Sequence, residues 1–302
     1  MNGKISNLIE VASLRRYTLT EGSERGLEVI DCDNGRIRFL LNVSKACDVM
    51  QLYHRGVNVS FVSKNGFSPR ELPFLDRFEG GMLYTCGLDS VGGRDGFEIH
   101  GSLHNNPARI TRAECTKEGI FVEAVVKSTS LFGKNLTLIR KIESKIGADT
   151  LSIKDTVQND GFSSENYALL YHINIGYPML DEGARVLLAE KECTPRTPWS
   201  AERLETRYFV SDAVPTEEET CYFLNLKEPK AELINEKLGK SLSVSYSGDT
   251  LPHFIEWRSM GSGDYALGFE PATTLLDDKF ACRTLGPAEK VEFSIEISVR
   301  DI

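Results

Sequence analysis

Short runs in which apolar and polar residues alternate recur along most of the chain. In one of them, Val122, Ala124 and Val126 would share an apolar face of an extended segment. Glu123 and Lys127 would then point to the opposite, solvated face. Alternation with a period of two residues is typical of a β-strand with one buried face. The pattern therefore predicts strands as the dominant element.

The end of the chain and several turn signals support the same interpretation. Residues 291–299 alternate strictly and are predicted to form a half-buried strand. Strand-like runs are separated by short sequences that favour turns: Asn34-Gly35, Asn65-Gly66 and Asn159-Asp160-Gly161. Only residues 202–209 and 226–239 could be helical. An all-β fold is therefore expected.

One long segment, residues 184–219, breaks the strand pattern. It carries three prolines and many charged residues, so we expect it to cross the surface as an irregular excursion. Segments of this kind often form the wall of a binding site on a rigid scaffold. The sequence contains no internal repeat, low-complexity tract or linker. We therefore predict a single domain that spans residues 1–302.

The composition excludes several classes of protein. Of the 302 residues, 41% are hydrophobic and 26% are charged, which is enough for a large core and unlike a disordered chain. A net charge of −9 argues against a nucleic-acid-binding face. No Lys/Arg block or long apolar stretch indicates a membrane, and the N-terminus lacks the apolar region of a secretory signal. Seven scattered cysteines without a C-x-x-C pair predict reduced thiols and hence a cytoplasmic location.

The chain has only five histidines, so the residues around them are informative. His172 lies in the apolar run NYALLYHINIG, with Asn174 two residues further on. In a strand these two side chains share one face, and Ile173 and Ile175 lie on the other. A polar pair on an otherwise apolar strand suits the wall of a pocket. The alternative is a hydrogen-bonded histidine of the core.

A second candidate is Glu270, which follows an apolar run and precedes Pro271. An acid at the end of an apolar strand is costly unless it is paired, solvated or functional. A glutamate on the surface at the end of a strand is the alternative interpretation. Trp257, nearby in the sequence, offers a flat apolar face of the kind on which sugars stack, although a tryptophan of the core is equally common.

Four runs carry a resemblance to a known family: GGMLYTCGLDSVGG, HGSLHNNPA, YHINIGYPMLDEGA and EWRSMGSGDYALGFEPAT. In this order they resemble the galactose mutarotase-like superfamily. Within it they are similar to the aldose 1-epimerase-related proteins classed as a domain of unknown function, DUF4432. The resemblance extends from about Arg15 to the end of the chain. It implies a large antiparallel β-sandwich of the galactose mutarotase-like (supersandwich) type.

The resemblance also implies roles for particular residues. Aldose 1-epimerases carry a strand histidine that acts as an acid, which matches His172, and a late glutamate that acts as a base, which matches Glu270. An earlier histidine of an H-G pair matches His100. The remaining candidates for substrate binding are His104, Asn174, Asp181 and Trp257.

The implied reaction interconverts sugar anomers by acid/base ring opening and closure. This chemistry requires neither a metal nor an organic cofactor. We expect a small-molecule sugar as the partner, and neither nucleic acid nor a membrane. The oligomeric state is open, with a homodimer as one option.

The resemblance leads to two expectations about arginine residues. Glu270 must be ionised to act as a base, so a cation should lie near it, and Arg258 is the candidate by proximity in the sequence. The family's G-R-x-x-N-R segment, whose first arginine helps to hold the sugar, has no counterpart here. Arg77 and Arg94 flank the corresponding region, but neither lies in such a motif. The sugar, or even the reaction, can therefore differ from ordinary hexose mutarotation.

Two other functions remain open. His100 and His104, together with Glu114 or Glu270, could bind a divalent metal in a cupin-like sugar isomerase. The spacing of the two histidines suits a helix, however, and Gly101 disfavours one. The second alternative is a non-catalytic carbohydrate-binding or sensing protein on the same scaffold, because a fold alone does not fix activity. Stoichiometric metal would favour the first alternative, and sugar binding without anomer exchange would favour the second.

Overall fold

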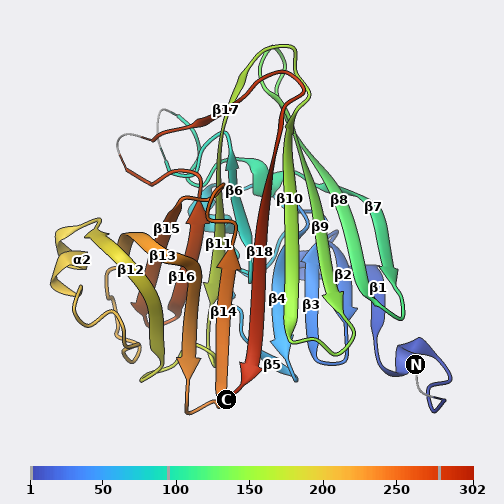
Figure 1. Cartoon of the computed structure of the whole chain (residues 1–302), viewed down its shortest axis with the longest axis horizontal. Helices are drawn as coiled ribbons and strands as arrows, with labels where there is room; N and C mark the ends of the chain where they lie inside the picture. Colours follow the sequence, from blue (N-terminus) through green and yellow to red (C-terminus); the bar gives the residue numbers. More distant parts are fainter. Residues whose placement is uncertain (1–2, 94–95, 278–279) are drawn as a thin grey trace.

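Strands dominate the structure, a computed structural model that describes residues 3–93, 96–277 and 280–302 (Figure 1). The described helices are single turns: α1 (Phe74–Arg77), α2 (Pro198–Glu202) and the 3₁₀ turns Leu8–Glu10, Gly22–Glu24 and Leu103–Asn105. The predicted all-β fold is confirmed. No helix among the described residues has the length and apolar character needed to cross a membrane.

The described strands form two antiparallel sheets. The smaller sheet has the order β1 (Ser13–Thr18), β2 (Glu28–Asp33), β3 (Ile37–Asn42), β4 (Asp48–His54) and β5 (Val57–Asn58). The larger sheet has the order β17 (Arg283–Leu285), β11 (Glu165–Ile175), β16 (Asp264–Ala272), β15 (His253–Gly261), β13 (Thr220–Asn235), β14 (Lys240–Tyr246), β18 (Lys290–Asp301), β10 (Thr150–Asn159), β9 (Asn135–Lys145), β8 (Gly119–Thr129) and β7 (Ala108–Cys115). In addition, β12 (Arg185–Pro195) pairs with β13, and β6 (Tyr84–Leu88) pairs with β11.

The main hydrophobic core lies between the two sheets. In Figure 1 the smaller sheet lies behind strands β7–β10 of the larger one. One continuous core cluster contains Phe39 and Leu41 from β3 together with Val122 and Ala124 from β8. The period-two predictions for residues 122–127 and 291–299 are confirmed, because the apolar positions of β8 and β18 are buried.

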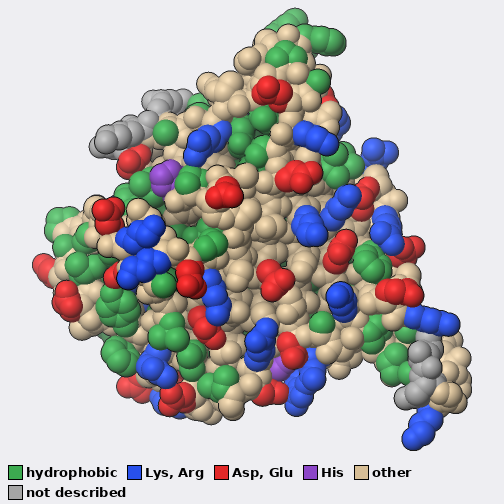
Figure 2. All heavy atoms as spheres, viewed as in Figure 1, with side chains coloured by type: hydrophobic (Ala, Val, Ile, Leu, Met, Phe, Trp, Pro, Cys, Tyr) green, Lys and Arg blue, Asp and Glu red, His purple; other side chains and the backbone are tan. Residues whose placement is uncertain are grey.

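Acidic and basic side chains are interspersed on the outer face of the larger sheet, which faces the viewer in Figure 2. Glu123 on β8 lies opposite Lys141 on β9, for example, with their charged atoms 3.7 Å apart. Opposite charges at facing positions of neighbouring strands stabilise a sheet modestly and keep this face solvated.

The structure corrects two expectations about local structure. Residues 226–239, proposed as possible helix, are mostly part of β13, where Ala231 and Leu233 are buried and the strand pairs with β12 and β14. The segment 184–219 is not irregular throughout, because Arg185–Pro195 forms β12. The rest of it contains α2 and a connection at one end of the larger sheet (Figure 1).

A buried network of charges joins the two sheets inside the core. The fully buried Arg140 of β9 donates from Nη1 to Asp48 of β4 at 2.5 Å and from Nη2 to Asp155 of β10 at 2.7 Å. Tyr171 of β11 donates to the same carboxylate of Asp155 at 2.8 Å. His104 binds Asp48 through Nδ1 at 2.6 Å. Each buried charge in this network therefore has a partner of opposite sign, as the low-dielectric interior requires.

Candidate active site

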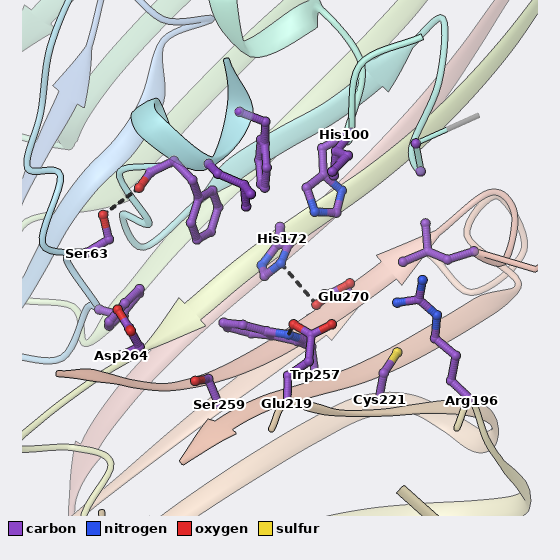
Figure 3. Close-up of a pocket in the computed structure, with 18 of the residues that line it drawn as sticks. Ser63, His100, His172, Arg196, Glu219, Cys221, Trp257, Ser259, Asp264 and Glu270 are labelled. Carbon is purple, nitrogen blue, oxygen red and sulfur yellow. Dashed lines mark hydrogen bonds and ion pairs between the residues drawn. The ribbon is translucent and has the colours of Figure 1, made fainter. Parts of the chain in front are cut away.

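A cavity of about 900 Å³ lies against the larger sheet and collects most of the predicted site residues. His172 of β11, Glu270 of β16 and Trp257 of β15 line one wall. His100, in the loop after β6, lies beside His172, with the two ring centroids 5.4 Å apart (Figure 3). Figure 3 also shows aromatic side chains of the α1 region beside the two histidines; Phe78, for example, has its ring centroid 5.6 Å from that of His172. The cavity therefore combines polar groups with apolar walls, as small-molecule sites commonly do.

His172 and Glu270 form the centre of this site. Antiparallel pairing of β11 with β16 sets Ile173 opposite Phe269, so that His172 and Glu270 come from facing positions. The Nε2 of His172 is 3.2 Å from Oε1 of Glu270, and the two residues are only 3% and 1% exposed. Within the described residues, Nδ1 of His172 and Oε1 of Glu270 have no hydrogen-bond partner. Neither of these two polar atoms is therefore occupied by a hydrogen bond with another described residue.

Burial determines the protonation of this pair. It holds the pKa of His172 well below its usual value of 6.5, and nearby His100 acts in the same direction. Burial also raises the pKa of Glu270 well above its usual value of 4.5; Glu219 adds to this effect and Arg196 opposes it. Burial therefore favours the neutral form of each group, a protonated Glu270 and an uncharged imidazole.

His100, which lines the cavity, has an unusual backbone conformation. Its φ is +66°, and the following Gly101 has a φ of +72°. A Cβ atom at position 101 would lie 2.2 Å from the carbonyl oxygen of Ser90, so this position requires glycine. The Nδ1 of His100 lies 2.9 Å from the carbonyl oxygen of Val91 and must donate to it, which leaves Nε2 as an acceptor. Burial lowers the pKa of His100 to about 4, so the ring is uncharged at neutral pH.

Gly268 creates the space in which the pair lies. It precedes Glu270 by two residues on β16, so both positions face the cavity side of the strand. A Cβ atom there would approach Oε1 of Glu270 to 2.8 Å, and Cε1 of His172 and Cε3 of Trp257 to 3.2 Å each. The glycine of the sequence run ALGFEP thus leaves room for these three side chains.

The structure places three of the predicted substrate-binding residues outside the lining of the cavity. His104 is buried in the core network, where it binds Asp48 and stacks on Tyr84. Asn174 is buried, and its amide donates to the backbone carbonyl groups of Gly81 and His172. Asp181 lies beyond β11, where its carbonyl group accepts from Ala184 in a turn. We therefore no longer regard His104, Asn174 and Asp181 as substrate-binding residues.

Arg258 is not the cation near Glu270. It alternates with Trp257 along β15 and points to the other face of the sheet, where its Nε donates to Glu256 at 2.7 Å. The cation that lowers the pKa of Glu270 is Arg196, which follows β12 and lines the cavity. Of the two arginines considered for the missing motif, Arg77 donates to the carbonyl oxygen of Leu72 and binds Glu98, and Arg94 lies outside the described residues.

Arg196 and Glu219 are site residues that the sequence analysis did not identify. They lie near the two ends of the connection from β12 to β13, and both face the cavity in Figure 3. Glu219 accepts a hydrogen bond from Nε1 of Trp257 at 2.8 Å, which fixes the indole ring. The only signal in the sequence was the expectation that residues 184–219 would wall a binding site.

The metal site considered from the sequence is not assembled. His104 binds Asp48, away from His100 in the cavity wall. Glu114 is exposed on β7, where Arg112 donates to it at 2.6 Å. In the part of the chain that the structure describes, no group of three or more His, Cys, Asp or Glu side chains is arranged to hold a metal ion.

Comparison with known proteins places the chain in a family and a fold. The family model described as a domain of unknown function (DUF4432) matches residues 24–299. A candidate aldose 1-epimerase from Klebsiella pneumoniae subsp. pneumoniae MGH 78578 superposes with a TM-score of 0.85 at 18% identity, covering 96% of this chain and 84% of that one. A galactose mutarotase-like protein from Clostridium acetobutylicum gives a TM-score of 0.70 at 15% identity, with 97% and 100% covered.

A candidate mutarotase from Salmonella typhimurium gives a TM-score of 0.71 at 12% identity, covering 99% of this chain and 96% of that one. At such low identities these likenesses show the fold alone. No curated protein matches the chain.

Proposed function

Because the chain belongs to the DUF4432 family and has the galactose mutarotase-like fold, as the sequence predicted, we propose that it is an aldose 1-epimerase-like enzyme that interconverts the anomers of a free sugar. The observation that carries this proposal is the buried pair of His172 and Glu270, with Nε2 and Oε1 3.2 Å apart in the wall of a large cavity. An acid and a base that share one proton are what ring opening and closure need.

The reaction moves one proton off the anomeric hydroxyl and another onto the ring oxygen. In the reactive state, Glu270 is the carboxylate that takes the anomeric proton, and the His172 imidazolium donates to the ring oxygen. The bond between the anomeric carbon and the ring oxygen breaks, the carbonyl group rotates, and closure on its other face reverses both transfers. After ring opening, Glu270 holds the proton and His172 is neutral, which is the distribution that burial favours. Burial therefore stabilises the pair in the state that accompanies the open-chain sugar.

Other residues of the cavity would hold the sugar during this exchange. The acceptor Nε2 of His100 can take a hydrogen bond from a sugar hydroxyl, since its Nδ1 is engaged with Val91. Trp257, whose indole is fixed by Glu219, offers a flat face for the sugar ring. Arg196 provides a donor on the same wall of the cavity. None of these contacts requires a metal or an organic cofactor.

The proposal is tested by dissolving pure α anomers of common aldoses and following the optical rotation with and without the protein. We expect at least one aldose to reach its anomeric equilibrium faster than in buffer, in proportion to protein concentration. If no aldose equilibrates faster, while sugars bind to the cavity, the protein is a carbohydrate-binding module and the enzymatic proposal fails.

Replacing Gly268 by Ala is expected to reduce the exchange rate by at least about tenfold, because small displacements of reacting groups are costly. The new Cβ would contact the carboxylate end of Glu270, which can move aside, so the melting temperature should change little. Gly261→Ala is the control, since a Cβ at that position on β15 meets only ordinary contacts at 3.6 Å and beyond. Equal exchange rates in the two variants would contradict the packing described for Gly268.

The exchange rate should follow a bell-shaped dependence on pH. The active pair carries one proton, which it keeps between the lowered pKa of His172 and the raised pKa of Glu270. Below that range the pair gains a second proton, and above it the pair loses its only one. We therefore expect the acidic limb of kcat/KM to lie below pH 6.5 and the alkaline limb well above pH 4.5. An acidic limb above pH 6.5, measured after subtraction of the buffer-catalysed rate, would contradict this assignment.

A further inference from the structure

A second cavity, of about 260 Å³, lies on the opposite face of the strands that carry Trp257. In the pairing of β13 with β15, Cys221 lies opposite Trp257 and Thr220 lies opposite Arg258. Cys221 and Trp257 line the large cavity, whereas Thr220, Tyr222 and Arg258 line the small one. Because successive side chains of a strand point to opposite faces, the two cavities lie back to back across the same sheet.

Some hydrogen-bond donors of the residues at this second cavity have no acceptor among the described residues. Arg258 donates from Nε to Glu256 at 2.7 Å and from Nη1 to the carbonyl oxygen of Phe209 at 3.3 Å, but its buried Nη2 has no partner among the described residues. Arg207 donates from Nη1 to Glu256 at 2.7 Å, and its buried Nε also has no partner there. The same holds for the hydroxyl group of Tyr222. A buried donor without an acceptor costs about 1–3 kcal/mol, so these groups favour an occupant with acceptor oxygens.

The charges around the cavity do not add up to a positive excess. Arg207 and Arg258 are 2% and 5% exposed, and the fully buried Glu256 is the one carboxylate that both contact. Glu190, whose side chain is 23% exposed, also pairs with Arg207, and Glu218 lines the cavity. At the rim, Arg203 pairs with Glu217. An occupant would therefore be held by the unpartnered donor groups of the two arginines and not by an excess of positive charge.

We propose that this second cavity binds a small oxyanion, with Arg258, Arg207 and Tyr222 as its donors. The planar guanidinium group matches the oxygens of a carboxylate or a phosphate group better than any other side chain does. Thr206, Ser211 and Thr220 also line the cavity. The Thr206 hydroxyl group donates to the carbonyl oxygen of Arg203, which leaves Ser211 and Thr220 as further candidate donors to such an anion. This inference is independent of the proposed sugar chemistry, because the two cavities share no lining residue.

The test is calorimetric titration of the full chain with inorganic phosphate and, separately, with acetate, both at an ionic strength held constant with chloride. We expect saturable binding of at least one of the two anions, and a melting temperature that rises with its concentration. The anion that binds with the higher affinity identifies the ligand as a phosphate or a carboxylate. If neither anion binds or stabilises the protein beyond the chloride control, the cavity holds solvent only and the proposal is overturned.

Tyr222→Phe locates the binding at this cavity. It removes only a hydroxyl group that has no hydrogen-bond partner among the described residues, so the variant should fold with an unchanged melting temperature in the absence of anion. Its affinity for the anion should fall about tenfold, the effect of losing one hydrogen bond to a charged group. Tyr246→Phe is the matched control, because that ring stacks on Phe254 and lies outside the cavity lining. Unchanged affinity in Tyr222→Phe would place the anion elsewhere and overturn the proposal.

Discussion

Replacing Glu270 by Gln is expected to lower the rate of anomer exchange by about 10²- to 10⁴-fold, the usual contribution of a general base. Gln has the shape of a protonated glutamate but cannot take a proton from the anomeric hydroxyl. Since burial already favours the protonated form of Glu270, the variant should fold as well as the natural protein. The exchange rate of each protein tests the expected loss of catalysis. Its melting temperature, measured under the same conditions, tests the expected stability.

Two further variants distinguish a loss of catalysis at the pair from the effect of a Glu-to-Gln change elsewhere. Glu114→Gln makes the same change on the exposed face of β7 and should leave the exchange rate unchanged. His172→Gln removes the other half of the pair and should lose activity to a similar extent. If Glu270→Gln keeps the natural exchange rate, the pair is not the catalytic centre, even if the other variants lose activity.

Replacing Arg140 by Met is expected to lower the free energy of unfolding by about 3–5 kcal/mol, as for other buried charge pairs that lose one partner. The guanidinium group is fully buried and joins Asp48 of the smaller sheet to Asp155 of the larger one. Its removal would leave two carboxylates in the core without their cation, although His104 and Tyr171 still contact them. The midpoint of urea unfolding measures this loss.

The control for this substitution is Arg112→Met on β7. Arg112 pairs with Glu114, but both side chains are nearly half exposed. Surface ion pairs contribute only about 0–1 kcal/mol, so the midpoint should move little. Similar midpoints for the Arg140 and Arg112 variants would mean that the buried network does not hold the two sheets together.

The strands and the chemical character of the site could be predicted from the sequence because both are local properties. Alternation shows which face of β8 or β18 is buried, and an isolated His172 or Glu270 at the end of an apolar run is conspicuous. The residue that each of these side chains contacts, by contrast, lies far away in the sequence. The pairing of β11 with β16 joins positions 98 residues apart, since 270 minus 172 is 98, and no local pattern specifies that register.

The incorrect predictions also arise because contacts made in the fold are not visible in the local sequence. His104 resembled a site residue in the run HGSLHNNPA, but Asp48, 56 positions earlier, holds it in the core. Arg258 was close to Glu270 in sequence, yet the alternation of β15 turns it to the opposite face. Residues 226–239 have the Lys/Glu-rich composition of a helix, but pairing with two neighbouring strands overrides this weak preference.

The claim that the His172–Glu270 pair exchanges sugar anomers is tested most directly by saturation-transfer NMR on a free aldose at equilibrium. Saturation of the anomeric proton of one anomer should reduce the signal of the other when the natural protein is present at neutral pH. The transfer should disappear with an equal concentration of Glu270→Gln, whose melting temperature is unchanged. Transfer of equal size with both proteins, or none with any aldose and the natural protein, would contradict the account.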